Sequence, residues 1–274
     1  EYITMGMAAY GKPMFTEYMK AYLLKRNNHK GISENILSWA KPYDLAASVQ
    51  KVYEDELERI VKKYCKKINL VLSGGCALNC VANSNLKRNI WIMPNPGDSG
   101  SSLGCIPAVT KERLNWKGPF LGYNIEGEYP VDSIIKELET NKMVGVANGR
   151  AEFGPRALGN RSLLADPRGA EVKDMVNAIK KRQKFRPFAP AILEEYLEEY
   201  FTIPTKKSPY MQFVAEAKMK TKAKSQDIQL KSMTGISNLL RASISVRKCP
   251  GQLSCVVNTI IVRTDQNTLS KLKS

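Results

Sequence analysis

The chain has 274 residues, enough for two ordinary domains or one large one, and 43% of them are hydrophobic while 25% are charged. This composition is typical of a globular protein and excludes a disordered or fibrous one. The net charge of +16 suggests an anionic partner. Because the lysines and arginines are spread along the chain, charge alone gives nucleic acid weak support, and a phosphorylated small molecule is also compatible.

Export and membrane insertion are not indicated. No apolar run approaches the roughly 20 residues that a membrane span needs, and no signal-peptide pattern opens the chain. The chain does not begin with Met, so we expect upstream residues to be missing. Its only histidine, His29, lies in a polar stretch typical of a loop rather than a zinc site. The six cysteines show no disulfide framework, which predicts reduced thiols in a cytoplasmic protein: Cys65, Cys76, Cys80, Cys105, Cys249 and Cys255.

The first part of the chain alternates between helices, strands and glycine turns. Residues 44–67 carry the apolar spacing of an amphipathic helix, with Asp44 as its N-cap. Residues 68–75 predict a buried strand that ends in a glycine turn, 76–88 a helix, and 89–94 a second strand. This order predicts an α/β fold, in which ligands bind where the strands end.

A break in the pattern near Trp116 predicts a domain boundary, because Gly, Pro and aromatic residues crowd together there without periodicity. The elements expected beyond it are helices at 130–142, 169–185 and 194–201 and strands at 143–149, 186–193 and 208–218. After about residue 227 the clear periodicity ends.

Two glycine loops follow the predicted strands of the first part. Gly74 and Gly75 lie between a strand and a helix, where backbone N–H groups can face a phosphate. The next loop places Asp98 between Gly97 and Gly100, so its carboxylate could hold a metal near such phosphates. Either loop alone is equally compatible with a simple turn.

The stretch "GRAEFGPRALGNRS" (149–162) places Arg150, Arg156 and Arg161 among glycines. It fits either a solvated loop or an anion cradle, since guanidinium groups bind phosphate bidentately. Further basic residues, Lys180, Arg182 and Arg186, follow it. Arg186 stands between apolar neighbours and is more plausibly aimed at a ligand than at solvent, whereas Lys180 could equally well complement a helix dipole.

Six blocks of the sequence resemble, in the same order, the NodU/CmcH family of O-carbamoyltransferases. The blocks are "MGMAAYG", "LSGGCALNCVANS", "NPGDSGSSLG", "GRAEFGPRALGNRSLLADPR", "IKKRQKFRPFAPAIL" and "SPYMQF". The resemblance implies the C-terminal part of an actin-like ATPase domain (1–115), similar to the threonylcarbamoylation enzymes, followed by a YrdC-like α/β domain (116–226). In this family the YrdC-like domain converts carbamoyl phosphate and ATP to carbamoyl-adenylate and pyrophosphate, and the actin-like domain transfers the carbamoyl group to a substrate hydroxyl with bound iron(II).

The resemblance also assigns residues. It implies that Arg156, Lys180 and Arg186 bind and activate carbamoyl phosphate and that Asp98 is a metal ligand. It places Gly74, Gly75 and Asn79 in the nucleotide-facing loop, and we add Gly100, Arg150 and Arg161 to the expected cofactor-binding set. The expected ligands are ATP, carbamoyl phosphate and a hydroxyl-bearing small molecule or sugar, with the acceptor and the oligomeric state left open.

Two departures from the family pattern qualify this expectation. The family's histidine metal ligands lie in a segment that this chain does not contain, so we expect a truncated chain with an incomplete iron site. Residues 227–274 are unlike the family, and we expect a divergent, frameshifted tail. Two alternatives therefore stay open: an inactive remnant that still binds nucleotide or carbamoyl phosphate, and a basic nucleic-acid-binding protein.

Overall fold

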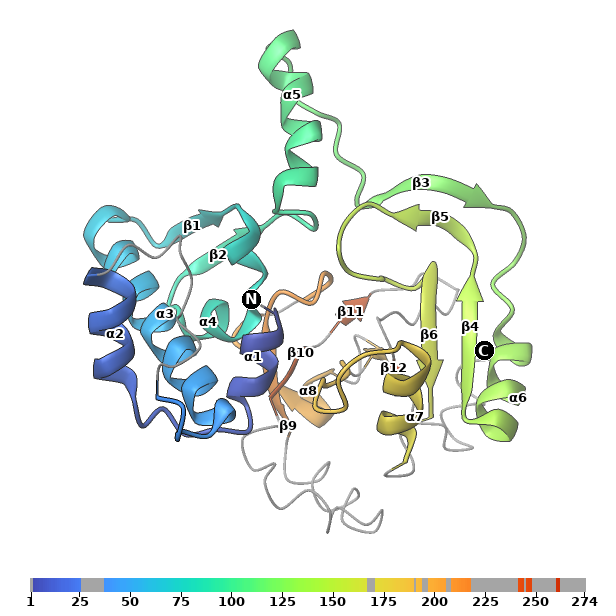
Figure 1. Cartoon of the computed structure of the whole chain (residues 1–274). Coiled ribbons are helices and arrows are strands. Elements are labelled where there is room, and N and C mark those ends of the chain that lie inside the picture. The colour runs from blue at the N-terminus through green and yellow to red at the C-terminus, as the bar shows by residue number, and fades with distance from the viewer. Residues whose placement is uncertain are drawn as a thin grey trace.

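A computed structural model shows a mixed α/β protein whose two halves lie side by side (Figure 1). His29, Cys249, Cys255 and nearly all of the predicted tail lie outside the described residues. The structure describes residues 2–25, 37–166, 171–189, 191–193, 197–205, 208–217, 241–243, 245–247 and 260–261.

The first half is built mainly from helices around a short pair of strands. Its helices are α1 (Tyr2–Ala8), α2 (Thr16–Lys25), α3 (Pro42–Tyr64), α4 (Cys80–Asn85) and α5 (Ser101–Thr110). Its strands are β1 (Asn69–Leu72) and β2 (Asn89–Ile92), and the 3-10 turns η2 (Gly75–Leu78) and η3 (Asp98–Gly100) follow them. The predicted order of helices, strands and glycine turns is therefore confirmed, although the helix expected at 76–88 is divided between η2 and α4.

Helix α3 begins two residues before the predicted N-cap. Lys41 is the last extended residue, and Pro42 occupies the first turn, where a missing N–H costs nothing. Asp44 therefore lies inside the first turn, and its Oδ1 accepts a hydrogen bond from the backbone N–H of Lys12 at 2.8 Å. The predicted N-cap at Asp44 is wrong by this shift, while the helix itself is confirmed.

Strands β1 and β2 pair in parallel, with Asn69 opposite Asn89 and Leu72 opposite Ile92. The strand predicted at 68–75 exists, but the prediction that it is buried is wrong. Alternate side chains of a strand face opposite ways, and Val71 is 68% exposed while its partner Trp91 is 55% exposed. The sequence pattern could not show that one face of this pair is left uncovered.

The second half contains antiparallel as well as parallel pairs. Strand β6 (Arg161–Ala165) pairs antiparallel with β4 (Met143–Ala147) and parallel with β12 (Ile260–Ile261). Strand β3 (Phe120–Ile125) pairs with β5 (Gly149–Glu152). The remaining elements are α6 (Val131–Asn141), α7 (Val172–Ile179), β7 (Ala191–Leu193), α8 (Leu197–Tyr200), β8 (Phe201–Thr202), β9 (Val214–Ala217), β10 (Arg241–Ser243) and β11 (Ser245–Arg247). The core of this half comprises Ile134, Leu138, Val146, Leu164, Ala189 and Met211.

Helix α7 ends earlier than the sequence predicts. Lys181 has φ +47°, a left-handed conformation that stops a helix, so the predicted helix over 169–185 is wrong beyond Ile179. Ile179, the last residue of the helix, is 55% exposed. The residues that follow form a turn instead, and this turn carries the basic side chains of the candidate site.

The two halves meet through buried polar contacts. Asn83 Nδ2 donates to the carbonyl oxygen of Gln212 at 3.1 Å, and Gln212 Nε2 donates to the carbonyls of Ile92 and Met93 at 2.9 Å each. The backbone N–H of Val214 donates to Ser84 Oγ. These bonds fix the edge of β9 against α4 and β2.

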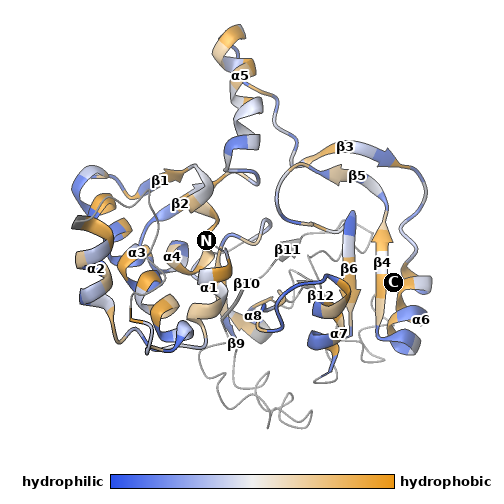
Figure 2. Ribbon diagram, in the orientation of Figure 1, coloured by the Kyte–Doolittle hydropathy of each residue, from blue (hydrophilic) through white to orange (hydrophobic). Residues whose placement is uncertain are grey.

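Helix α5 stands apart from both halves (Figures 1 and 2). None of its residues is buried, although much of the helix is apolar. The segment 111–118 that follows has no helix or strand, and the domain boundary near Trp116 falls within it and stays a prediction. Among the described helices, none combines the length and the apolar character needed to cross a membrane.

Candidate functional site

The loop 153–160 between β5 and β6 is held from inside by one carboxylate. Glu152 Oε1 accepts hydrogen bonds from the backbone N–H groups of Leu158 and Asn160 at 2.7 Å each and of Arg161 at 3.3 Å. Asn160 Nδ2 also donates to the carbonyl of Arg150 at 2.7 Å. A loop with this many internal bonds presents its remaining side chains in fixed positions.

The three arginines of this stretch have different surroundings. The Arg161 guanidinium donates to the backbone carbonyls of Asn148, Gly149, Asn160 and Tyr123, so it fastens the loop to its neighbours. Arg150 is exposed on β5, with its nearest acceptor a carbonyl at 3.4 Å. Arg156 lies at a pocket, and its buried Nε has no acceptor among the described residues.

The turn after α7 brings three more cations to the same pocket. Because the backbone N–H of Arg182 bonds to the carbonyl of Asn177 and that of Arg186 bonds to Gln183, the chain folds back over the end of the helix. Lys180, Arg182 and Arg186 are half-buried there, whereas the intervening Lys181 and Lys184 are exposed. The turn therefore separates its basic side chains into those that face the pocket and those that face solvent.

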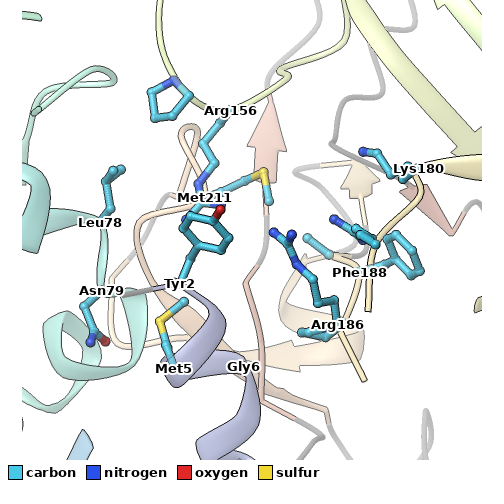
Figure 3. A pocket seen from close by; sticks show the side chains of 14 residues that line it. Tyr2, Met5, Gly6, Leu78, Asn79, Arg156, Lys180, Arg186, Phe188 and Met211 are labelled. Carbon is cyan, nitrogen blue, oxygen red and sulfur yellow. The ribbon is translucent and has the colours of Figure 1, made fainter. Parts of the chain in front are cut away.

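The pocket has a volume of about 420 Å³ and lies where the two halves meet (Figure 3). This is within the range usual for small-molecule sites. The second half contributes four cations, and none of the described lining residues carries a carboxylate. The described lining consists of Tyr2, Met5, Gly6, Leu78, Asn79, Pro155, Arg156, Lys180, Arg182, Arg186, Pro187, Phe188, Ala189 and Met211.

Burial, reinforced by the neighbouring positive charge, lowers the pKa values of two pocket cations. Burial, together with the neighbouring Arg182 and Arg186, lowers the pKa of Lys180 to about 8. Burial and then Arg186 lower the pKa of Arg182 to about 10. A bound anion would stabilise the charged form of both groups. Its negative charge would attract them, and its oxygens would accept the hydrogen bonds that water makes to an exposed cation.

Helix α1 supplies the opposite wall. Figure 3 shows Tyr2 beside Arg156 and Arg186, and the guanidinium carbon of Arg186 lies 4.7 Å from the centre of the Tyr2 ring. A cation at this distance from an aromatic ring is attracted by the electrons of the ring face. Two residues beyond this helix, the Tyr10 hydroxyl donates to the carbonyl of Phe185 at 2.9 Å, which joins the end of the helix to the basic turn.

Asn79 lines the pocket, but its side chain is engaged elsewhere. Its Oδ1 caps α4 by accepting from the N–H of Ala82 and also accepts from Gln50 Nε2, each at 3.1 Å. Its Nδ2 donates to Gln50 Oε1 at 2.9 Å. In this conformation Asn79 shapes the wall of the pocket rather than offering a donor to a ligand.

The glycine loops lie outside the described lining of the pocket. The N–H of Gly74 donates to the carbonyl of Pro96 at 2.7 Å, and Gly75 has open space around its α-carbon. Gly100 is required by packing, because a Cβ there would lie 1.7 Å from the carbonyl oxygen of Asn95. The nucleotide-binding role of these residues, and of Arg150 and Arg161, stays a prediction.

Asp98 is exposed at the start of η3. Across the described residues, no three side chains of the His, Cys, Asp and Glu types lie close enough together to hold a metal ion. A single exposed carboxylate does not provide the ligand set that an iron(II) site needs. The residues described here therefore do not fit that metal, and we derive no step through it.

Sequence reasoning assigned a role to three of the four cations and none to Arg182. Nothing in the run of basic residues distinguishes Arg182 from Lys181 and Lys184, because the distinction arises from the turn. It also missed Tyr2 and Glu152. The acidic residue within an arginine-rich loop was the only signal that could have pointed to Glu152 as an internal brace.

Comparison with known proteins supports the resemblance over most of the chain, and it extends the match to residues 227–246, which were expected to be unlike the family. Residues 2–106 match the family model described as Carbamoyltransferase N-terminus, and residues 135–246 match Carbamoyltransferase C-terminus. The nodulation protein NolO of Bradyrhizobium diazoefficiens is 34% identical over 279 residues, covering 80% of this chain and 50% of NolO.

Nodulation protein U of Sinorhizobium fredii is 38% identical over 173 residues, covering 55% of this chain and 30% of that protein. An uncharacterized protein of Methanocaldococcus jannaschii is 33% identical over 205 residues, covering 62% of this chain and 39% of its own length. The chain spans half or less of the length of these curated relatives.

Proposed function

The chain belongs to the carbamoyltransferase family, and from this premise we propose that it acts in O-carbamoyl transfer, with the pocket between its halves as the site for carbamoyl phosphate and the phosphates of ATP. The proposed acceptor is a hydroxyl group of a small molecule or sugar. The actin-like and YrdC-like character of the two halves belongs to the same proposal.

The convergence of Arg156, Lys180, Arg182 and Arg186 on one cavity carries this proposal. Two of their guanidinium nitrogens, Arg156 Nε and Arg182 Nη2, are buried without an acceptor among the described residues. A buried charged donor without an acceptor is costly, and we count these two donors as support for an anionic ligand of the pocket. Phosphate oxygens satisfy guanidinium donors well, because their spacing allows two parallel hydrogen bonds.

The proposed chemistry has two stages. Water releases orthophosphate from carbamoyl phosphate, and an oxygen of the resulting carbamate attacks the α-phosphorus of ATP, so that pyrophosphate leaves and carbamoyl-adenylate forms. The acceptor oxygen then attacks the carbamoyl carbon, AMP leaves, and the hydroxyl proton passes to solvent. In the first stage negative charge moves onto the leaving phosphates, and fixed cations in a partly buried site stabilise that charge.

The roles of the individual cations follow from their positions. Arg156 is presented by the braced loop 153–160, while Lys180 and Arg186 come from the turn after α7. Their approach from separate elements would surround a phosphoryl group rather than contact it from one side. Tyr2 lies against the Arg186 guanidinium, with its ring centre 4.7 Å from the guanidinium carbon, and would help to hold this cation at the ligand.

The proposal is tested by the exchange of labelled pyrophosphate into ATP, with and without carbamoyl phosphate. The wild-type chain should catalyse exchange that requires carbamoyl phosphate. We expect Arg156→Gln and Lys180→Gln each to lower the exchange rate by about 100-fold, because each removes a charged contact to the transition state. Lys184→Gln removes an exposed charge from the same turn and should leave the rate unchanged.

Other outcomes would overturn the proposal in different ways. A wild-type chain that binds carbamoyl phosphate but catalyses no exchange would be a binding remnant rather than a transferase. Exchange that survives both pocket substitutions would place the chemistry elsewhere. Exchange that falls equally in Lys184→Gln would indicate a general effect of charge rather than a site.

A further inference from the structure

Arg186 is contacted at both ends by one short segment of the first half. Tyr2 lies against its guanidinium, with 4.7 Å between the ring centre and the guanidinium carbon. At the backbone end, the Tyr10 hydroxyl donates at 2.9 Å to the carbonyl oxygen of the peptide group that joins Phe185 to Arg186. The N–H of the same peptide group donates to the carbonyl of Gln183 at 3.1 Å. Both polar atoms of this peptide group are therefore held, and Tyr10 is one of the two groups that fix its orientation.

The Tyr10 hydroxyl is itself held from the second half. On α7, Lys173 Nζ donates to the hydroxyl oxygen at 3.1 Å and lies 5.6 Å from the centre of the Tyr10 ring. The hydroxyl thus accepts from a charged donor while it donates to Phe185, and the charged donor strengthens the second bond because it polarises the hydroxyl. Tyr10 therefore links two points of the second half, one on α7 and one in the basic turn.

Aromatic packing gives the Tyr10 hydroxyl a defined position. The Tyr10 ring packs against Tyr43 of α3 with 5.7 Å between ring centres, and Tyr43 packs edge-on against Phe185 at 6.2 Å. The chain can approach Tyr43 this closely because the next residue is Gly11, where a Cβ would lie 2.0 Å from the Tyr43 carbonyl oxygen. The segment is thereby seated between the start of α3 and the basic turn.

We propose that Tyr10 is a positioning residue of the pocket, which holds the peptide group before Arg186 and thereby fixes the Arg186 guanidinium at the anion-binding site. This inference rests on the proposed function, which takes the pocket as an anion site, and deepens it. Tyr10 is not among the described lining residues, so it acts through Arg186 rather than by touching the ligand. The first half contributes none of the four pocket cations, yet it determines how well one of them meets the ligand.

Calorimetric titration of the whole chain with sulfate tests the inference, and Tyr10→Phe is the main variant because it removes only the hydroxyl. We expect it to lower sulfate affinity by about 5-fold, the effect of one lost hydrogen bond. In Arg186→Gln the same substitution should change affinity by less than about 2-fold, because the side chain that Tyr10 positions is gone. Tyr43→Phe is the matched control, since it removes a hydroxyl from the same aromatic cluster and keeps the bond from Tyr10 to Phe185. It should leave affinity unchanged.

The pH profile of sulfate binding gives a readout that a loss of stability alone would not change. Burial is the main reason why the pKa of Lys180 is lowered to about 8, and the charges of Arg182 and Arg186 add to it. We expect Tyr10→Phe to let the Arg186 guanidinium move away, so that the pKa of Lys180 rises and the midpoint of the profile moves to higher pH. Lys173→Met removes the charged donor to the Tyr10 hydroxyl and should shift affinity and midpoint in the same directions by less.

The outcomes separate this inference from the proposed function. If wild type does not bind sulfate, the pocket is not an anion site, and both fail. If Arg186→Gln weakens sulfate binding but Tyr10→Phe leaves affinity and midpoint as in wild type, only the role of Tyr10 is overturned. An equal loss from Tyr10→Phe with and without Arg186, at an unchanged midpoint, would show a general structural effect and would also overturn that role. A chain that behaves as expected with sulfate but catalyses no pyrophosphate exchange would retain the positioning role, while the proposed transfer fails.

Discussion

The two walls of the pocket differ in what they offer a ligand. The wall from the first half is neutral and consists of α1 and the residues around η2, with Tyr2, Met5 and Leu78 as its larger side chains. The wall from the second half brings four cations from two separate segments. Positive charge is thus concentrated in one half, and the first half lines the pocket with neutral side chains, among which Tyr2 lies against Arg186.

The difference matters because the two walls belong to separate parts of the chain. The two walls are joined by the hydrogen bonds of Gln212 with Asn83 and Ile92 and by the hydrogen bond from Tyr10 to Phe185. None of these residues is a pocket cation. A ligand with an anionic end and a neutral end would bind across this boundary. The comparison predicts unequal effects when each wall is altered.

The larger effect on anion binding is expected when a rise in pH neutralises Lys180 in the cationic wall. Since the pKa of Lys180 is lowered to about 8, the side chain is charged below that pH and becomes neutral above it. Anion affinity should therefore fall as pH rises, by about 10-fold between about pH 7 and pH 9. Sulfate is the suitable probe, because its own charge does not change over this range.

Lys180→Arg is the matched control for this titration, since arginine stays charged throughout. The pH dependence of sulfate binding should disappear in this variant. A slope that persists in Lys180→Arg would mean that a different group controls affinity. A sulfate affinity that rises with pH would contradict the predicted direction of the change.

A smaller effect is expected from trimming the neutral wall. Met5→Ala and Leu78→Ala remove apolar contacts but no donor or charge, so each should change sulfate affinity by less than about 3-fold. Calorimetric titration at a fixed pH measures this directly. A loss of 10-fold or more in either variant would show that the first half contributes to anion binding as strongly as the second.

Much of the local structure could be predicted because it depends on local patterns. The periodicity of 44–67 predicted α3, and the glycines after 68–72 and 89–92 predicted the turns that follow the two parallel strands. The start of α3 and the end of α7 were predicted less well. The end of α7 depends on the left-handed conformation of Lys181, which the sequence does not specify. The start of α3 is marked in the sequence by Pro42, which holds the preceding Lys41 extended, and the choice of Asp44 overlooked this signal.

The site was predicted in part. Spacing alone could not choose among Arg150, Arg156 and Arg161, because their separation depends on the bonds of Glu152 and on the carbonyls that surround Arg161. The resemblance to a known family brought Arg156 forward together with Lys180 and Arg186, and these three line the pocket. Arg182 could not be separated from its exposed neighbours before the turn was known.

The central claim is that the four cations, rather than the glycine loops of the first half, form the phosphate site. Diffraction from crystals of the chain grown with pyrophosphate would locate the anion. The account predicts pyrophosphate oxygens within hydrogen-bonding distance of Arg156 and Arg182, with Lys180 and Arg186 beside them. Pyrophosphate bound at Gly74, Gly75 or Gly100, with none between the four cations, would contradict it.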